Sequence, residues 1–547
     1  MQPGSRRVGL SNDSADRDRF QLENQASNLT LQPDSVATVE NFRQSIVHIS
    51  RQSAFFFAGT IFTAAAGYLF RIYVAKALGA EALGVYALGM TLVAFLGVFN
   101  ALGFSQSAVR FVASYCATGK LDLLRGFLAR ALGLLLFCSI VLGGTTLLAG
   151  PWIVTHLYHT PALRSYLPLF ALILVFGALN TFLGQVLAGY KDVARRTVIT
   201  NFIGSPVAMV GTFVLIGYGL ILWGYLFAQI AAATLVFGLL AASVWKLTPN
   251  AARSGGLPPL QQEVIHFSAT VFGMDFLCFL MAQTDKILIG VYLGAREVGI
   301  YAVAMALVAF VPIVLQSVNQ VFSPIIADLH ARGQFDALNR IFQTLTKWIL
   351  GLTFPLAAAM IVYAQPLMRM FGRDFEAGWT ILMIGTVGQL VNCAAGSVGY
   401  LLLMSGNQKR LIKIQTAMAI VTILMNLALV PRWGVTGAAA ASALTNIAMN
   451  LWCLRDVQRA LDLFPYNRNY FRLAFPAAGT ILALLLSQRV FSTIRPEWIG
   501  VALALAAAYA IFFTVALALG LDADDRLITE AVWPRIRAAF CSIEVTA

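Results

Sequence analysis

Two cations within apolar stretches of the sequence are the residues with the clearest potential for binding chemistry. Arg71 and Lys286 are 215 positions apart and hold matching places in two similar segments. A cation in hydrocarbon costs at least ~2.5–3.5 kcal/mol, so each side chain is expected to face protein, water or the interface. We predict that the two oppose each other across a cavity, where paired positive charges suit a diphosphate. The alternative is that both extend to the membrane interface and anchor their helices.

Further polar residues share the helical faces of these cations. Thr60 precedes Arg71 by eleven positions and Asp275 precedes Lys286 by eleven, so each pair lies on one face of a helix. We therefore predict that Thr60 and Asp275 also line the cavity. Asp285 and Asp275 are candidates for ion or proton coupling, because carboxylates inside a membrane mark such sites. Asp285 is equally well explained as a local salt-bridge partner of Lys286.

Amide side chains gather in one predicted helix, at Gln316, Asn319 and Gln320. Amides offer both donors and acceptors, which suits the hydroxyl groups of a sugar. Hydrogen bonds between neighbouring helices are the simpler explanation. We include these three residues among the predicted cavity residues.

Three arginines, Arg110, Arg195 and Arg196, lie in predicted cytoplasmic connectors. We predict that they stand at the cytoplasmic entrance of the cavity, where they would attract an anionic headgroup. Topology signals and contacts with lipid headgroups are the alternative roles of such cations.

Motifs for catalysis or metal binding are missing from the sequence. His156 and His159 form an HxxH without a third ligand, and no CxxC pair, HExxH, GxSxG or GxxxxGK[ST] occurs. We predict that the chain is not an enzyme and binds no metal or cofactor.

The elements that must position these residues are membrane-spanning helices. Hydrophobic residues make up 59% of the chain and charged residues 12%, whereas soluble domains have about 25% charged residues. The net charge of +13 is spread over short connectors, with no basic stripe and no interleaved aromatics, so nucleic acid is not an expected partner.

Windows of about 20 apolar residues, each long enough to span a bilayer, recur along the chain. They predict an all-α polytopic membrane protein with about 14 transmembrane helices. The Lys and Arg residues favour the connectors that are inside if both termini are cytoplasmic. The predicted spans are 52–75, 84–105, 126–149, 165–188, 197–217, 220–245, 265–291, 297–323, 342–365, 378–404, 411–430, 434–454, 471–490 and 498–520.

An internal repeat organises these helices. The run LGAEALGVYALGMTLVAF at 78–95 returns as LGAREVGIYAVAMALVAF at 293–310, with eleven of eighteen positions identical. Six predicted helices separate the copies, so both copies have the same orientation in the membrane. We predict two pseudo-symmetric six-helix lobes plus two C-terminal helices.

The predicted domains follow from this repeat and from the polar ends of the chain. They are a disordered cytoplasmic tail at 1–50, an N-terminal lobe at 51–250, a C-terminal lobe at 251–460, two extra helices at 461–520 and a cytoplasmic tail at 521–547.

Three segments carry a resemblance to a known family. RIYVAKALGAEALGVYAL at 71–88, DKILIGVYLGAREVGIYAV at 285–303 and VPRWGVTGAAAASAL at 430–444 resemble the polysaccharide-transporter branch of the multidrug/oligosaccharidyl-lipid/polysaccharide exporter superfamily. The resemblance implies a flippase of the bacterial inner membrane that moves undecaprenyl-diphosphate-linked oligosaccharide by alternating access. It also implies membrane lipids, and a polysaccharide polymerase or chain-length machinery, as partners.

Two other function classes remain open. A cation-coupled exporter of drugs belongs to the same superfamily, but its cavity should be lined by carboxylates because its substrates are positively charged. A membrane enzyme of polysaccharide polymerisation would need a sizeable outer loop, and the predicted connectors are short.

Overall fold

The computed structural model describes residues 33–249, 258–467, 470–491 and 497–518, with side chains described from Ala66 onward. Residues Gly67–Thr529 form one compact unit. Both ends of the chain, for which we predict tails, lie outside the described residues at 1–32 and 519–547. The first helix, α2, already begins at Pro33, within the segment 1–50.

Helices make up the described part of the chain, which contains no strand. Four short helical turns, η1 (Pro161–Tyr166), η2 (Val198–Gly204), η4 (Arg373–Gly378) and η5 (Tyr470–Leu473), connect them. The helices are α2 (Pro33–Ala101), α3 (Phe104–Ala117), α4 (Leu121–His156), α5 (Leu167–Gly189), α6 (Val193–Thr197), α7 (Ser205–Gly217), α8 (Ile221–Leu247), α9 (Gln262–Tyr292), α10 (Ala295–Val308), α11 (Ile313–Ala331), α12 (Phe335–Val362), α13 (Ala364–Arg369), α14 (Trp379–Ala395), α15 (Val398–Met404), α16 (Gln408–Leu461), α17 (Ala474–Phe491) and α18 (Glu497–Ala518).

The predicted spans fall on these helical segments. Ten helices among the described residues are long and apolar enough to cross a membrane, and the pair α10 and α11, bent by 52°, is an eleventh. Two of the long helices contain two predicted spans each, because α2 is interrupted at Gly79 and α16 at Gly434. A further predicted span coincides with α17, a shorter apolar helix. The all-α polytopic fold is therefore confirmed.

Backbone geometry repeats along the chain with the same spacing as the sequence. Residues with positive φ recur 214 or 215 positions apart, as Gly79 and Gly294, Gly119 and Gly333, Lys191 and Gly406, and Gly219 and Gly434. At Gly79 and Gly294, φ is 74° and 95° with ψ near 180°, a region that essentially only glycine enters. The two copies of the repeat thus turn at equivalent points.

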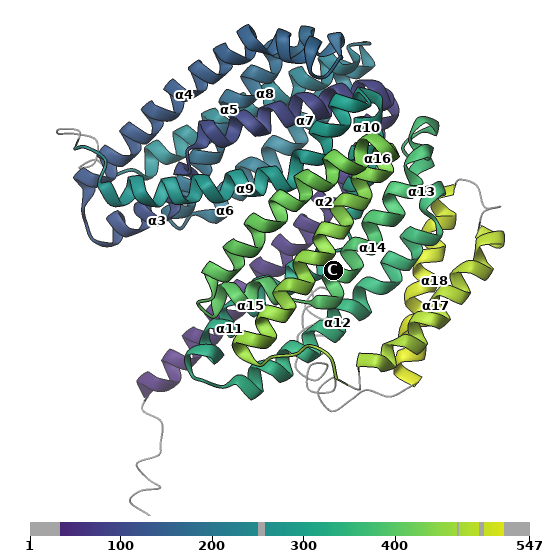
Figure 1. Cartoon of the computed structure of the whole chain (residues 1–547). Coiled ribbons are helices and arrows are strands. Elements are labelled where there is room, and N and C mark those ends of the chain that lie inside the picture. The colour runs from purple at the N-terminus through teal and green to yellow at the C-terminus, as the bar shows by residue number, and fades with distance from the viewer. Residues whose placement is uncertain (1–32, 250–257, 468–469, 492–496, 519–547) are drawn as a thin grey trace, which may run out of the picture. The chain divides into compact units, whose positions relative to one another are not determined.

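Contacts between helices follow the two halves of the repeat. In Figure 1, α3 to α8, drawn in blue, pack against one another, and α10 to α16, drawn in teal and green, form a second group. Helix α9 joins them, since it contacts α3 of the first group and α16 of the second. The terminal pair α17 and α18 packs against α12.

The two halves meet where α2 crosses α10. A Cβ atom added at Gly84 would collide with the carbonyl group of Ala295, and one added at Gly299 would collide with the carbonyl oxygen of Ala80. Gly84 and Gly299 are repeat-related, and so are Ala80 and Ala295. The two backbones therefore touch twice in equivalent ways, and buried side chains such as Leu88 pack around the crossing.

We expect Gly84→Ala and Gly299→Ala each to lower the free energy of unfolding by about 1–3 kcal/mol, because the added methyl group overpacks a backbone contact. Gly97→Ala is the matched control, since Gly97 lies in α2 with open space around its Cβ position. Alanine there should be neutral or stabilising by up to about 1 kcal/mol. Thermal unfolding of the purified protein in detergent measures all three, and equal stability of the three variants would contradict the crossing.

Candidate functional site

A cavity of about 650 Å³ lies beside the crossing, between the two halves of the repeat. Its walls come from α2, α7, α8, α9 and α10. Both Arg71 and Lys286 line it. The other polar side chains in its wall are Tyr68, Tyr86, Thr91, Ser205, Tyr225, Gln229 and Gln283. We call this space the central cavity.

Positive charge dominates the central cavity. Among the described residues that line it there is no carboxylate. The ammonium group of Lys286 donates a hydrogen bond to Oε1 of Gln283 at 3.0 Å. Arg71 is exposed to the cavity and forms no hydrogen bond or ion pair with the residues whose side chains are described. Its guanidinium donors are therefore available to an anionic ligand.

Aromatic side chains supply much of the remaining wall. Tyr86 and Tyr225 meet edge to face with ring centroids 4.9 Å apart, and Tyr68 packs edge-on against Phe310 at 5.3 Å. Sequence reasoning missed the two tyrosines Tyr86 and Tyr225. Tyr86 lies inside the repeated run at 78–95, so the repeat was a signal that could have indicated it. Tyr225, like Gln229, comes from α8, whose approach to α2 no sequence pattern indicates.

Asp285 points away from the central cavity into a smaller one. This second cavity, of about 270 Å³, lies among α9, α10, α14 and α16. Asp285 is only 6% exposed and accepts hydrogen bonds from the hydroxyl of Tyr301 at 2.5 Å and from the backbone N–H of Lys286 at 2.7 Å. The Lys286 ammonium turns instead to Gln283. Other polar groups around the second cavity are Gln389, Asn392, Thr422, Ser442, Thr445 and Asn446.

Several predicted cavity residues lie elsewhere. Asp275 is half-buried on α9 and does not line the central cavity. Phe279, which lies between Asp275 and Lys286 in α9, packs against Phe95 with ring centroids 5.5 Å apart. The physical reason is that the helical face from Asp275 to Lys286 is longer than the cavity wall, and the beginning of α9 packs on α3.

The predicted amides and Thr60 are also apart from the central cavity. No residue of α11 lines it, so Gln316, Asn319 and Gln320 do not reach it. Gln316 and Gln320 are exposed, whereas Asn319 is buried with its Oδ1 unpaired among the described residues. Thr60 lies in α2, but its side chain is outside the described part.

Arg110 forms contacts between α3 and α9. Its guanidinium binds Oε1 of Glu263 at 2.9 Å and lies over the ring of Phe267 at 4.6 Å from the centroid. One turn away, the hydroxyl groups of Ser107 and Ser268 are 2.6 Å apart in a buried hydrogen bond. Arg110 thus fastens the beginning of α9 to α3.

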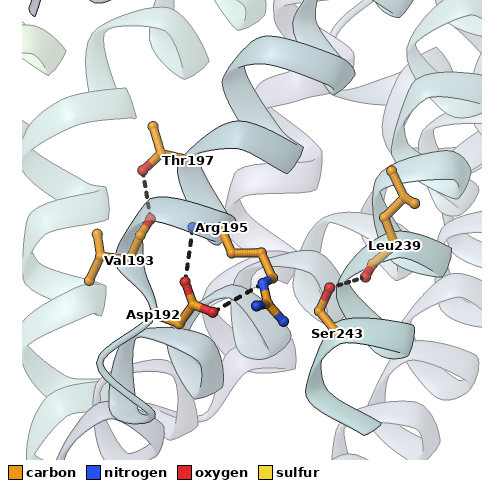
Figure 2. A network of polar contacts seen from close by, with 6 residues as sticks. All are labelled: Asp192, Val193, Arg195, Thr197, Leu239 and Ser243. Carbon is orange, nitrogen blue, oxygen red and sulfur yellow. Dashed lines mark hydrogen bonds and ion pairs between the residues drawn. The ribbon is translucent and has the colours of Figure 1, made fainter. Parts of the chain in front are cut away.

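Arg195 and Arg196 contact neighbouring side chains. Figure 2 shows Asp192 accepting a hydrogen bond from the backbone N–H of Arg195 at 3.1 Å and pairing with its Nε at 3.0 Å. Asp192 is therefore the N-cap of α6. Arg196 donates to Oε1 of Gln185 at 3.1 Å. Both arginines shape the turn before α7 as well as adding charge there.

A comparison with known protein families shows which family the chain belongs to. The family described as polysaccharide biosynthesis protein matches residues 73–377, more than half of the chain. The chain belongs to this family. The match covers α10 and the part of α2 from residue 73 onward, which carry the repeated run and the helix crossing, and it confirms the resemblance found in the sequence.

The individual relatives of this chain are distant in sequence. The chain is 22% identical over 439 residues to the probable flippase AglR of Haloferax volcanii, covering 76% of this chain and 85% of the relative. A structure of the lipid II flippase MurJ in an inward closed conformation matches with a TM-score of 0.63 at 17% identity, covering 83% of this chain and 98% of the other. An inward-facing MATE multidrug transporter matches with a TM-score of 0.58 at 15% identity, covering 72% and 94%. The chain has the fold of these transporters.

The buried hydrogen bond behind the cavity wall gives a stability prediction. Tyr301→Phe should lower the free energy of unfolding by about 1–3 kcal/mol, because the Asp285 carboxyl group then loses a partner in a buried place. Tyr292→Phe is the matched control, since Tyr292 lies on the same helix as Asp285 and is 49% exposed. Thermal unfolding compares the two variants. A loss of the same size in both would show that the Tyr301 hydroxyl contributes nothing specific.

Proposed function

We propose that this protein is a flippase that moves an undecaprenyl-diphosphate-linked oligosaccharide across the inner membrane by alternating access. The product would serve the synthesis of a cell-surface polysaccharide such as O-antigen, capsule or exopolysaccharide. The observation that carries the proposal is a central cavity between two repeat-related halves, lined by Arg71 and Lys286 and by no carboxylate among the described residues.

The charges of the cavity suit an anionic substrate on energetic grounds. Each cation costs ~2.5–3.5 kcal/mol to place in a membrane on insertion scales. An anion about 4 Å from a cation gains about 4 kcal/mol at an effective dielectric constant of 20. A diphosphate between Arg71 and Lys286 would offset the cost of both charges, whereas a cationic drug would increase it. This is the reason to prefer lipid-linked sugar over drugs.

The remaining wall suits the sugar part of such a substrate. Ser205, Gln229 and Gln283 offer hydroxyl and amide groups, and Tyr86 and Tyr225 offer aromatic surfaces, all on the central cavity. These groups replace the α11 amides as the candidates for sugar contacts. Family membership and the relative named as a probable flippase support transport rather than polymerisation.

The proposed location is the bacterial inner membrane with both termini in the cytoplasm. It rests on the distribution of Lys and Arg residues over the connectors. In this orientation Gly79 and Gly294 lie at the outer side. A substrate would enter from the side of Arg110, Arg195 and Arg196, and a polymerase or chain-length protein would receive it outside.

Ion or proton coupling is the second part of the proposal. Asp285 is next to Lys286 in sequence, yet its side chain lines the second cavity, whose wall also holds polar side chains of α14 and α16. A proton or cation taken up there would act on the same helix that presents Lys286 to the substrate. Asp275, half-buried further along α9, is the other carboxylate proposed for coupling.

The paired cations give the principal test. Arg71→Gln combined with Lys286→Gln should reduce delivery of lipid-linked sugar to the outer leaflet by at least about 100-fold, because two charged contacts worth about 1.5–3 kcal/mol each are lost. Arg164→Gln combined with Lys246→Gln is the matched control, since both side chains are exposed and neither lines the cavity. Flipping of a fluorescent lipid-linked sugar in proteoliposomes is measured. Normal flipping by a folded Arg71/Lys286 variant would disprove the proposal.

Coupling is tested by the carboxylates. Asp285→Asn keeps a hydrogen-bonding group of the same size but cannot bind a proton or compensate a cation. We expect flipping by this variant to become independent of an imposed proton or sodium gradient, while wild-type flipping accelerates. Asp275→Asn, measured in the same vesicles, shows whether the second carboxylate contributes. A full gradient response in both variants would exclude coupling through either residue.

A further inference from the structure

A third cavity opens beside the central one and differs from it in chemistry. It has a volume of about 250 Å³ and lies among α2, α4 and α9. Apart from Thr91, Thr145, Thr146 and Tyr158, all its lining residues are apolar. We call it the side pocket. It shares Thr91 with the wall of the central cavity.

The polar groups in the side pocket are either hydrogen-bonded within their own helix or uncharged. The hydroxyl groups of Thr91, Thr145 and Thr146 each donate to the carbonyl oxygen four residues earlier in their own helix, at 2.8 Å. These threonines therefore need no further hydrogen-bond acceptor. Burial raises the pKa of Tyr158 to about 12, so this phenol is uncharged. The side pocket consequently suits a hydrocarbon group.

Adjacent residues of α9 connect the two spaces. Lys286 lines the central cavity and Ile287, the next residue, lines the side pocket. Successive Cα atoms are about 3.8 Å apart. Because both spaces also share Thr91 in their walls, a ligand with a charged group in the central cavity can extend an apolar group into the side pocket. The rim of the side pocket includes Phe95 and Leu157, which are 38% and 42% exposed, so a chain can continue outward from it.

The repeat partners of residues near the side pocket have different surroundings. Phe310 is the repeat partner of Phe95, and Tyr68 is the partner of Gln283. Tyr68 packs edge-on against Phe310 at 5.3 Å and Phe371 at 6.0 Å, which makes a closed aromatic cluster. Phe95 instead packs against Phe99 and Phe279. The two halves therefore differ here: Phe95 lines the side pocket, whereas its partner Phe310 lines the central cavity.

We infer that the side pocket binds the first isoprenoid units of the lipid carrier while the diphosphate lies between Arg71 and Lys286. This inference rests on the proposed function, since it assigns a place to the hydrocarbon part of the same substrate. The chain then leaves the protein between α2 and α4, past Phe95 and Leu157. The substrate enters and leaves the central cavity sideways on this side.

The test uses two probes on the purified full-length protein in lipid nanodiscs. The first is farnesyl diphosphate with a diazirine on its second isoprene unit, and the second is methyl diphosphate, which lacks the isoprenoid. After irradiation, we expect the label of the first probe on residues that line the side pocket, which are Leu92, Phe95 and Leu96 of α2, Ile287 of α9, and residues of the segment 145–158 in α4 and the turn after it. Label found only outside these residues would overturn the inference without using any variant.

A matched pair of variants measures the contribution of the side pocket. Thr146→Phe fills the side pocket and should weaken binding of the farnesyl probe about tenfold. This is the loss expected when roughly two methylene groups are no longer buried. Methyl diphosphate should bind unchanged. Thr181→Phe on α5 is the control, because Thr181 has the same hydrogen bond to its own helix but faces outward. Unchanged binding of the farnesyl probe to folded Thr146→Phe protein would contradict the inference.

The same probes separate this inference from the proposed function. Arg71→Gln combined with Lys286→Gln should weaken the binding of both probes. If it does so while the label falls outside the residues that line the side pocket, the diphosphate site stands and the assignment of the side pocket is wrong. If it weakens neither probe, the proposed function itself fails.

Discussion

The contact of two helix backbones at Gly84 and Gly299 is the constraint on which the rest of the structure depends. Each glycine lies against the carbonyl group of the residue that follows a turning glycine, Ala295 after Gly294 or Ala80 after Gly79. Any larger side chain would separate the halves. Because the contact is made twice in equivalent ways, it defines the local symmetry of the two copies. Arg71 and Lys286 each precede a turning glycine by eight residues, or about 12 Å of helix, so the crossing places both cations at the same depth.

Symmetry explains the position of the cations but not their different surroundings. Tyr86 and Tyr301 are repeat partners, yet Tyr86 lines the central cavity and Tyr301 is fully buried against Asp285. The residue that matches Asp285 in the first half is Phe70. One half therefore holds a buried carboxyl group behind its cation, and the other holds an apolar side chain. The two copies of the repeat share their backbone geometry, but the side chains around their cations differ in polarity and charge.

The same divergence gives three neighbouring spaces distinct properties. The central cavity is positive, the second cavity is polar with one carboxyl group, and the side pocket is apolar. Helix α9 borders all three, through Lys286, Asp285 and Ile287 in turn. Successive residues of a helix point about 100° apart, so one turn of α9 serves three environments. A movement of α9 would affect all three at once, and Arg110 and Ser268 attach its far end to α3.

The amino-acid sequence by itself determined the membrane class, the helical spans, the repeat and the two cations, because hydrophobic length and self-similarity are local properties of a chain. It gave no account of which helices meet. Tyr225 and Gln229 reach the central cavity only because α8 packs beside α2, whereas Gln316, Asn319 and Gln320 carry suitable chemistry but α11 turns them elsewhere. Periodicity assigned Asp275 to the face of Lys286, but it does not show where a cavity ends. Tertiary packing determines which of these side chains reach the cavity, since this depends on contacts between residues that are distant in sequence.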